Sequence, residues 1–192
     1  MLKKDKIILK ISEILAFFLL GVLFMYSFLF GVIAKCVYPL KYKETIIKSA
    51  EEYGLDRYLV FAVCKEESNF NEKAKSSKGA YGLMQITEDT GKYIAELKNV
   101  SNYDLYNAET NVDFGCYYLK YLIDKYQRED TAIVAYNAGE GTVSTWLKNE
   151  EYSKDSKTLL IIPYKESREY LKKIKRSLQN YRKIYRNIVD KK

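Results

Sequence analysis

One long stretch without any charged residue, residues 14–34, limits how this chain can fold. It has 21 residues, and a helix needs about 20 predominantly apolar residues to cross the hydrocarbon core of a bilayer. Residues 1–13 before it form a short basic segment. We therefore expect a cytoplasmic tail at 1–13, a transmembrane signal-anchor at 14–34, and an extracytoplasmic remainder on a single-pass protein of the cell membrane.

A cleaved signal peptide is the main alternative for this stretch. The apolar core of a signal peptide has roughly 7–15 residues and precedes small residues at a cleavage site. This stretch is longer and ends Val32-Ile33-Ala34-Lys35, and the charged Lys35 also disfavours lipoprotein modification of Cys36. Lysines flank both ends, so the positive-inside rule favours a cytoplasmic N-terminus only slightly.

The remainder of the chain predicts a mainly helical domain at 44–192, joined to the anchor by a short tether at 35–43. Apolar residues recur there at helical spacing. The predicted helices cover residues 44–53, 57–67, 88–97, 109–126, 131–135, 141–147 and 165–189. Gly54 is expected to end the first helix, and Asp56, Thr87 and Asp130 to cap three others. The only candidate strand is Leu159–Ile162.

The absence of histidine restricts the chemistry. It excludes Ser-His-Asp and Cys-His nucleophilic machinery and most transition-metal sites. The three cysteines, Cys36, Cys64 and Cys116, have no metal-ligand spacing. A Cys64–Cys116 disulfide is conceivable if the two helices face each other, but buried free thiols are favoured. Acid–base chemistry then falls mainly to carboxylates.

Positive charge is concentrated in the C-terminal helix. From Tyr164 to the end there are 11 Lys or Arg and 3 Asp or Glu, in a chain of net charge +7. Such a face could contact anionic lipid headgroups or anionic wall polymers, or it could simply be solvated. No recognition motif accompanies it, so nucleic acid is not an expected partner.

A carboxylate, Glu67, stands at the end of an apolar run that is typical of a buried helix. Burial penalises the charged form of a carboxyl group and so favours a proton donor near neutral pH. The alternative is an ordinary helix-end glutamate that faces solvent. The polar loop after it ends with Gly82-Leu83-Met84-Gln85.

Three separated segments decide between these interpretations. The first is Glu67-Ser68 with Asn71, Ser76, Gly79-Ala80 and Gly82-Leu83-Met84-Gln85; the second is Ala135-Tyr136-Asn137-Ala138-Gly139 with Gly141, Val143 and Trp146-Leu147; the third is Ile162-Pro163-Tyr164 with Glu166, Arg168 and Tyr170-Leu171. In their order and spacing the chain resembles the soluble lytic transglycosylase family, the bacterial SLT domain, which is related to goose-type lysozyme. The resemblance covers roughly residues 44–186.

The resemblance implies a lysozyme-like helical fold and cleavage of the β-1,4 bond between N-acetylmuramic acid and N-acetylglucosamine in peptidoglycan strands. Glu67 would be the single catalytic acid/base, and the muramic acid C6 hydroxyl would close a 1,6-anhydro ring without water. By the same resemblance, no metal or cofactor would be needed. The implied substrate-binding residues are Ser76, Gln85, Tyr136, Asn137 and Glu166, with the Tyr136 hydroxyl placed near Glu67.

The sequence departs from the family pattern in several places. Glu72 stands where proline is common, Thr87-Glu88 follow the Gln-Ile pair instead of Met-Pro, and Tyr81 replaces a usually small residue. Glu66 directly precedes Glu67, so repulsion could raise the pKa of Glu67. If Glu66 or Glu72 positioned a water molecule, the chain would be a lysozyme-type muramidase. A non-catalytic wall-binding scaffold protein is the other alternative.

Overall fold

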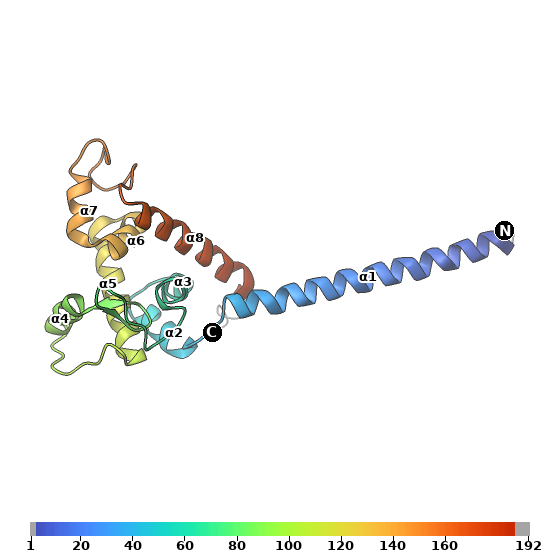
Figure 1. Ribbon diagram of the computed structural model, residues 1–192, viewed down its shortest axis with the longest axis horizontal. Helices are drawn as coiled ribbons and strands as arrows, with labels where there is room; N and C mark the ends of the chain where they lie inside the picture. The colour runs from blue at the N-terminus through green and yellow to red at the C-terminus, as the bar shows by residue number, and fades with distance from the viewer. Residues whose placement is uncertain (1–2, 187–192) are drawn as a thin grey trace. The chain divides into compact units, whose positions relative to one another are not determined.

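The prediction of a mainly helical chain is confirmed. The computed structural model describes residues 3–186, with side chains from residue 10 onwards. It divides into two compact units, residues 1–39 and residues 40–192 (Figure 1). The long apolar helix forms the first unit, and the second unit contains the other described helices together with one small hairpin.

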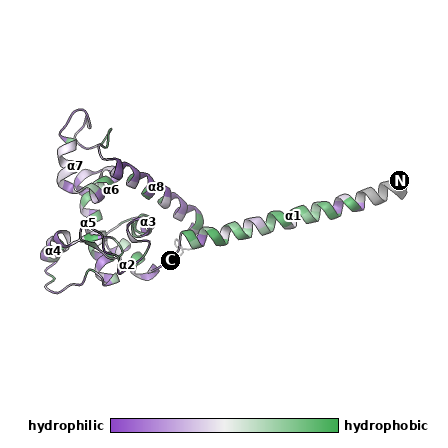
Figure 2. Ribbon diagram, viewed as in Figure 1, coloured by the Kyte–Doolittle hydropathy of each residue, from purple (hydrophilic) through white to green (hydrophobic). Residues whose placement is uncertain are grey.

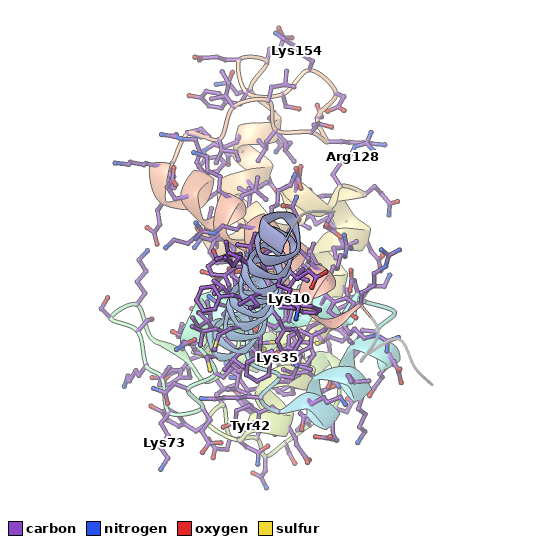
Figure 3. All side chains as sticks on the ribbon, turned by 90° about the vertical axis from the view of Figure 1, so that its right-hand side faces the viewer. Lys10, Lys35, Tyr42, Lys73, Arg128 and Lys154 are labelled. Atoms are coloured by element: carbon purple, nitrogen blue, oxygen red, sulfur yellow. The ribbon has the colours of Figure 1, made fainter. Side chains whose placement is uncertain are left out.

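The first unit is helix α1, Lys3–Val37. Its part from Lys10 to Val37 is long and apolar enough to cross a membrane, and no side chain in its apolar window is buried in the protein. Figure 2 shows this helix as mostly hydrophobic. In the sequence, Lys10 precedes and Lys35 follows the uncharged stretch; both are labelled in Figure 3. The helix runs three residues into the predicted tether, so five residues, 38–42, separate it from the next helix.

The second unit is a helical domain with a short hairpin. Its elements are α2 (Lys43–Glu52), α3 (Arg57–Ser68), β1 (Ala80–Tyr81), β2 (Ile86–Thr87), α4 (Glu88–Leu97), α5 (Ala108–Tyr126), α6 (Glu129–Ala138), α7 (Glu140–Leu147) and α8 (Lys165–Tyr185). The two antiparallel strands pair Ala80 with Thr87 and Tyr81 with Ile86. No strand was expected there, because two residues are too short to show a period-two pattern.

The hydrophobic core of this domain comes from residues after the anchor. Helix α3 is buried along residues 58–64 and packs against α2 and α8, while α5 packs against α6. Among the largest fully buried side chains are Ile46, Phe61, Phe114, Leu122 and Tyr181. Because helix α1 contributes no described buried side chain, residues 40–192 contain a complete core, and we expect them to fold without α1.

Two of the predicted helix caps and one stop signal are confirmed. The side chain of Asp56 accepts a hydrogen bond from the backbone N–H of Tyr58 (2.8 Å), and Thr87 accepts one from Thr90 (3.2 Å). Gly54 follows α2 with φ of 61°, a conformation that glycine adopts without the penalty of a Cβ atom. These signals set the entry of α3, the helix that ends with Glu67.

The predicted cap at Asp130 is wrong. Helix α6 begins two residues earlier than predicted, at Glu129, with the extended residue Arg128 as its N-cap. Asp130 therefore lies in the first turn, and its carboxylate forms an ion pair with Lys175 of α8 (2.7 Å). Arg128 and Lys154 extend from the surface of the domain (Figure 3).

The predicted strand at 159–162 is also wrong. This segment is irregular and finds no partner strand among the described residues. Instead, the backbone N–H groups of Leu160 and Ile161 both point at the carbonyl of Tyr152 (2.8 and 3.4 Å). Pro163 follows and has no N–H to continue a ladder. The segment leads directly into α8, whose predicted continuation to residue 189 lies outside the described residues.

Candidate active site

Glu67 lies in the last turn of α3, where the buried part of the helix meets the polar loop. Burial of the preceding residues places its carboxylate at the edge of the core, and the side chain is itself partly buried. The helix ends at the next residue because Asn69 adopts a left-handed conformation and its N–H bonds to the Lys65 carbonyl (2.9 Å). The chain therefore turns away immediately after the carboxylate.

The carboxylate of Glu67 is held by a tyrosine of α8. The hydroxyl of Tyr170 donates a hydrogen bond to Oε1 of Glu67 at 2.5 Å. Burial raises the pKa of Glu67 to about 7; the hydrogen bond from Tyr170 acts in the opposite direction, and the negative charges of Glu166 and Glu66 raise it further. A group with a pKa near the working pH can both donate and accept a proton, as general acid–base catalysis requires.

The neighbouring Glu66 is engaged elsewhere. It accepts hydrogen bonds from Lys65 (3.0 Å) and from Ser177 of α8 (2.5 Å). Burial alone would raise the pKa of Glu66, but these two hydrogen bonds and the charges of Lys65 and Lys173 bring it below its ordinary value. Two adjacent carboxyl groups thus have opposite tendencies, one toward the protonated form and one toward the charged form.

Tyr136 lies close to Glu67 but donates its hydroxyl proton elsewhere. Its hydroxyl binds the backbone carbonyl of Met84 at 2.8 Å. Burial first, and then the negative charge of Glu67, raise the pKa of Tyr136, so the phenol stays neutral. The donor to the carboxylate is therefore Tyr170, to which sequence reasoning gave no role. A part for the Tyr136 hydroxyl in the chemistry of Glu67 stays a prediction.

A buried asparagine positions the loop that carries Met84. The side chain of Asn111, in α5, accepts from the N–H of Met84 (2.7 Å) and donates to the carbonyls of Tyr81 and Leu105 (both 2.8 Å). Gly82 has φ of 72°, and a Cβ atom there would lie 2.4 Å from the Leu105 carbonyl and from the Asn111 amide. The motif glycine is needed for this close approach.

Ser76 and Gln85 stabilise the loop around the site. The hydroxyl of Ser76 accepts from the backbone N–H groups of Lys78 (3.2 Å) and Ala80 (3.0 Å). The Gln85 amide donates to the carbonyls of Gly82 (3.0 Å) and Ala74 (3.4 Å). These contacts set the shape of the loop, and the contact of both side chains with substrate stays a prediction.

Asn137 and Glu166 bring the end of α6 and the start of α8 to the same region. Oδ1 of Asn137 accepts from the hydroxyl of Ser167 (2.8 Å). Glu166 is exposed and forms an ion pair with Lys78 of the loop (3.4 Å). Because its charge acts on the pKa of Glu67, the three sequence segments converge on one carboxyl group.

The cysteines and acidic groups form no metal site in the part of the chain with described side chains. There, no group of three or more His, Cys, Asp or Glu is arranged to hold an ion. Cys64 and Cys116 are free and buried, as favoured from the sequence. Burial raises the pKa of both thiols, so they remain protonated and unreactive.

The comparisons with known proteins agree with this convergence. The family model described as "Transglycosylase SLT domain" matches residues 44–160, more than half of the chain. The chain belongs to this family. The match contains Glu67, Ser76, Gln85, Tyr136 and Asn137, whereas α8 with its tyrosine lies beyond it. The resemblance stated from the three segments is thereby confirmed.

Similar proteins are lytic transglycosylases of greater length. The chain is 32% identical over 143 residues to the soluble lytic murein transglycosylase of Salmonella typhimurium, covering 71% of this chain and 22% of that protein. It is 33% identical over 172 residues to the membrane-bound lytic murein transglycosylase C of Yersinia pestis, covering 74% and 47%. The chain thus spans about a fifth and about half of these relatives.

Solved structures of the family share the fold. The crystal structure of the 70-kDa soluble lytic transglycosylase from Escherichia coli matches with a TM-score of 0.69 and 29% identity, covering 78% of this chain and 25% of that one. The inactive glutamate-to-glutamine mutant of lytic transglycosylase Slt from Pseudomonas aeruginosa matches with a TM-score of 0.66 and 26% identity, covering 77% and 25%.

Proposed function

We propose that this SLT-family protein is a membrane-anchored peptidoglycan lytic transglycosylase with Glu67 as its single catalytic acid/base. The observation that carries the proposal is the partly buried carboxyl of Glu67, with a pKa of about 7, oriented by Tyr170. The inactive glutamate-to-glutamine mutant of the P. aeruginosa relative supports the need for one carboxyl group in such an enzyme.

The reaction needs one carboxyl group that acts twice. Glu67 donates its proton to the glycosidic oxygen while the bond from that oxygen to C1 of N-acetylmuramic acid breaks. The carboxylate then takes the proton of the C6 hydroxyl of the same sugar as this oxygen attacks C1. The products are a free 4-hydroxyl on N-acetylglucosamine and a 1,6-anhydro end, Glu67 is protonated again, and no water is consumed.

The surroundings of Glu67 favour this route over hydrolysis. A hydrolase generally needs a second carboxylate as nucleophile or base. Glu66 binds Lys65 and Ser177, and Glu72 accepts from the hydroxyl of Tyr42 (3.0 Å). Each of these carboxylates is thus bound by other side chains of the protein, which disfavours the lysozyme-type muramidase. The intact acid and its tyrosine disfavour a non-catalytic scaffold.

The remaining residues are assigned to substrate binding. Ser76 and Gln85 belong to the loop after α3, Asn137 to the end of α6, and Glu166 to the start of α8. In our proposal their polar groups line the glycan path on either side of Glu67, and Tyr136 forms the wall behind the carboxyl. A glycan or peptide that contacts Glu166 would have to displace its exposed pair with Lys78.

The anchor places this chemistry outside the cytoplasm. Helix α1 is long enough to span the bilayer, and the Yersinia relative is named membrane-bound. In our proposal residues 14–34 cross the membrane once, residues 1–13 are cytoplasmic, 35–43 form the tether and the domain at 44–192 is extracytoplasmic. The basic helix α8 contacts anionic lipid or wall polymer.

Mass spectrometry of muropeptides released from purified peptidoglycan tests the activity. The enzyme used is residues 40–192, which contain the whole core. We expect products one water lighter than hydrolytic ones, with no reducible muramic end. Reducing ends would show a muramidase instead. No release by the folded domain from walls of several bacteria would support the scaffold alternative.

A further inference from the structure

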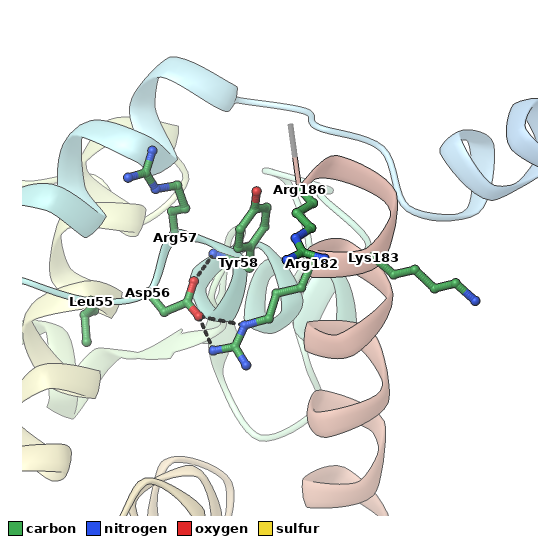
Figure 4. Close-up of a pocket in the computed structure, with 7 residues that line it drawn as sticks. All are labelled: Leu55, Asp56, Arg57, Tyr58, Arg182, Lys183 and Arg186. Atoms are coloured by element: carbon green, nitrogen blue, oxygen red, sulfur yellow. Dashed lines mark hydrogen bonds and ion pairs between the residues drawn. The ribbon is translucent and has the colours of Figure 1, made fainter. Parts of the chain in front are cut away.

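A basic pocket lies on the domain away from the residues that surround Glu67, between the start of α3 and the last turns of α8 (Figure 4). Its volume is about 710 Å³. Its lining residues are Leu55, Asp56, Arg57, Tyr58, Arg182, Lys183 and Arg186. The proposed reaction makes no use of any of them.

The pocket has an excess of positive charge. Four of its lining residues are cationic and one, Asp56, is acidic, which leaves a formal charge of +3. Asp56 is already engaged, since it caps α3 and forms an ion pair with Arg182. Glu51 lies 4.0 Å from Arg57 at the edge. Like charges held together favour binding of an anion.

Contacts between the two helices hold Arg182 in place, whereas Lys183 extends away from it (Figure 4). Nε of Arg182 donates to Oδ2 of Asp56 at 3.1 Å, and a second nitrogen of the same guanidinium donates to the same oxygen. The hydroxyl of Tyr58 donates to the Tyr185 carbonyl at 2.9 Å. These bonds join the start of α3, the positive end of its dipole, to the end of α8.

The chemistry of the pocket suits a phosphate group. Guanidinium groups bind phosphate oxygens with paired hydrogen bonds, and arginine is the preferred residue for such sites. A helix N-terminus adds partial positive charge. Three of the four cationic residues here are arginines: Arg57, Arg182 and Arg186.

The position of the pocket indicates where the phosphate comes from. The segment that enters α2 and the end of α8 lie at the same end of the domain (Figures 1 and 4). Only residues 38–42 separate α1 from α2, and an extended chain of this length spans at most about 22 Å. When α1 crosses a bilayer, this end of the domain stays close to the lipid headgroups.

We infer that this pocket binds the phosphate groups of anionic phospholipids and holds the domain against the membrane surface. The inference rests on the proposed membrane anchoring. It narrows the lipid contact of α8 to Arg182, Lys183 and Arg186 at its end, with Arg57 of α3 beside them. In this inference the two ends of α8 have different roles: its start lies beside Glu67, and its end contacts the membrane.

Sedimentation with lipid vesicles tests this inference with residues 40–192. The vesicles contain phosphatidylcholine alone, or phosphatidylcholine with about a third of phosphatidylglycerol. We expect the domain to bind only the anionic vesicles. Each cation near an anionic surface contributes about fivefold in affinity, so the triple variant Arg57→Gln, Lys183→Gln, Arg186→Gln should bind at least tenfold more weakly. Arg182 is kept because it pairs with Asp56.

A matched control has the same loss of charge at distant positions. Lys92, Lys148 and Lys154 are exposed, and their triple replacement by Gln should reduce vesicle binding much less. Equal losses in both variants would show attraction by net charge and overturn the pocket. Calorimetry with inorganic phosphate distinguishes free phosphate from lipid phosphate as the ligand. If the pocket variant loses phosphate binding but not vesicle binding, the lipid assignment is overturned.

An anionic wall polymer is the other ligand that could bind in the pocket. Binding of purified anionic wall polymer by the pocket, with no vesicle binding, would also overturn the inference. Neither the vesicles nor the phosphate solution contains a glycan strand. The binding results therefore do not depend on whether the domain cleaves peptidoglycan. A domain that releases anhydro products but ignores anionic vesicles would fail only this inference.

Discussion

At the scale of single residues, the proposed mechanism couples activity to stability through the protonation of Glu67. Burial raises its pKa to about 7 from an ordinary value of 4.5. The folded protein therefore binds this proton more tightly than the unfolded chain does. The associated stability is fully present below the unfolded pKa and is lost as pH rises through the folded one. Stability therefore falls between the unfolded and the folded pKa, whereas the protonated fraction that a proton donor needs falls around the folded pKa.

Replacing Glu67 by Gln should separate the effect on activity from the effect on stability. Gln cannot donate and recover a proton, so product release should fall by about 10²–10⁴-fold. The variant should be more stable than the wild type by about 2 kcal/mol at pH 8, with little difference near pH 4, because the amide carries no charge to bury. Urea unfolding at both pH values checks this. Wild-type lysis of walls by the variant would refute the assigned acid.

Tyr170 is a positioning residue, and its removal should change the pH profile. Its hydrogen bond favours the charged form of Glu67, so Tyr170→Phe should move the alkaline limb of kcat/KM upward by about one pH unit. The rate should also fall because the carboxyl loses its orientation. Tyr136→Phe is the matched control, since that hydroxyl donates to the Met84 carbonyl. An equal shift in the control would contradict the role of Tyr170.

Sequence reasoning reached Glu67 but not Tyr170. Glu67 was predictable because it ends an apolar helix and opens a recognisable motif. Tyr170 is one of 19 tyrosines, and only the packing of α8 on α3 shows which one reaches the carboxyl. The role of Asn111 could not be predicted from the sequence either. A polar residue near the start of a helix is expected to be exposed, whereas Asn111 is fully buried.

At the scale of elements, α5 supports the loop that carries Met84. Replacing Asn111 by Ala would leave one N–H and two carbonyl groups without their side-chain partner. Unsatisfied buried groups cost about 1–3 kcal/mol each, so we expect a loss of at least about 3 kcal/mol in urea unfolding. Asn107→Ala, which removes the exposed cap of the same helix, should cost only about 1 kcal/mol. Similar losses would contradict this account.

The elements themselves were predicted better than their details. The caps at Asp56 and Thr87 act over a few residues and could be predicted from local sequence. Asp130 could not, because its carboxylate is used by Lys175, a residue 45 positions away. The candidate strand at 159–162 has the right composition, but a strand needs a partner, and none is provided by the described residues.

At the scale of the whole molecule, the proposed function implies that the short tether limits where the enzyme can cut. Inserting about 20 flexible residues after Pro39 would add roughly 25 Å of average reach. With the full chain reconstituted in a supported bilayer, the longer variant should release more anhydro products from overlaid intact walls. Soluble glycan fragments should be cut at equal rates by both forms. Equal release from intact walls would show that the tether sets no limit.

The five residues between α1 and α2 also change how the rate of glycan cleavage depends on the amount of enzyme. An enzyme in solution finds substrate in proportion to its concentration in a volume. An enzyme tethered by a linker of at most about 22 Å can reach only the glycan strands directly above its own position in the membrane. Once these are cut, it must diffuse sideways or wait for new strands. Lateral mobility and surface density, rather than turnover alone, would then set the pace of wall opening.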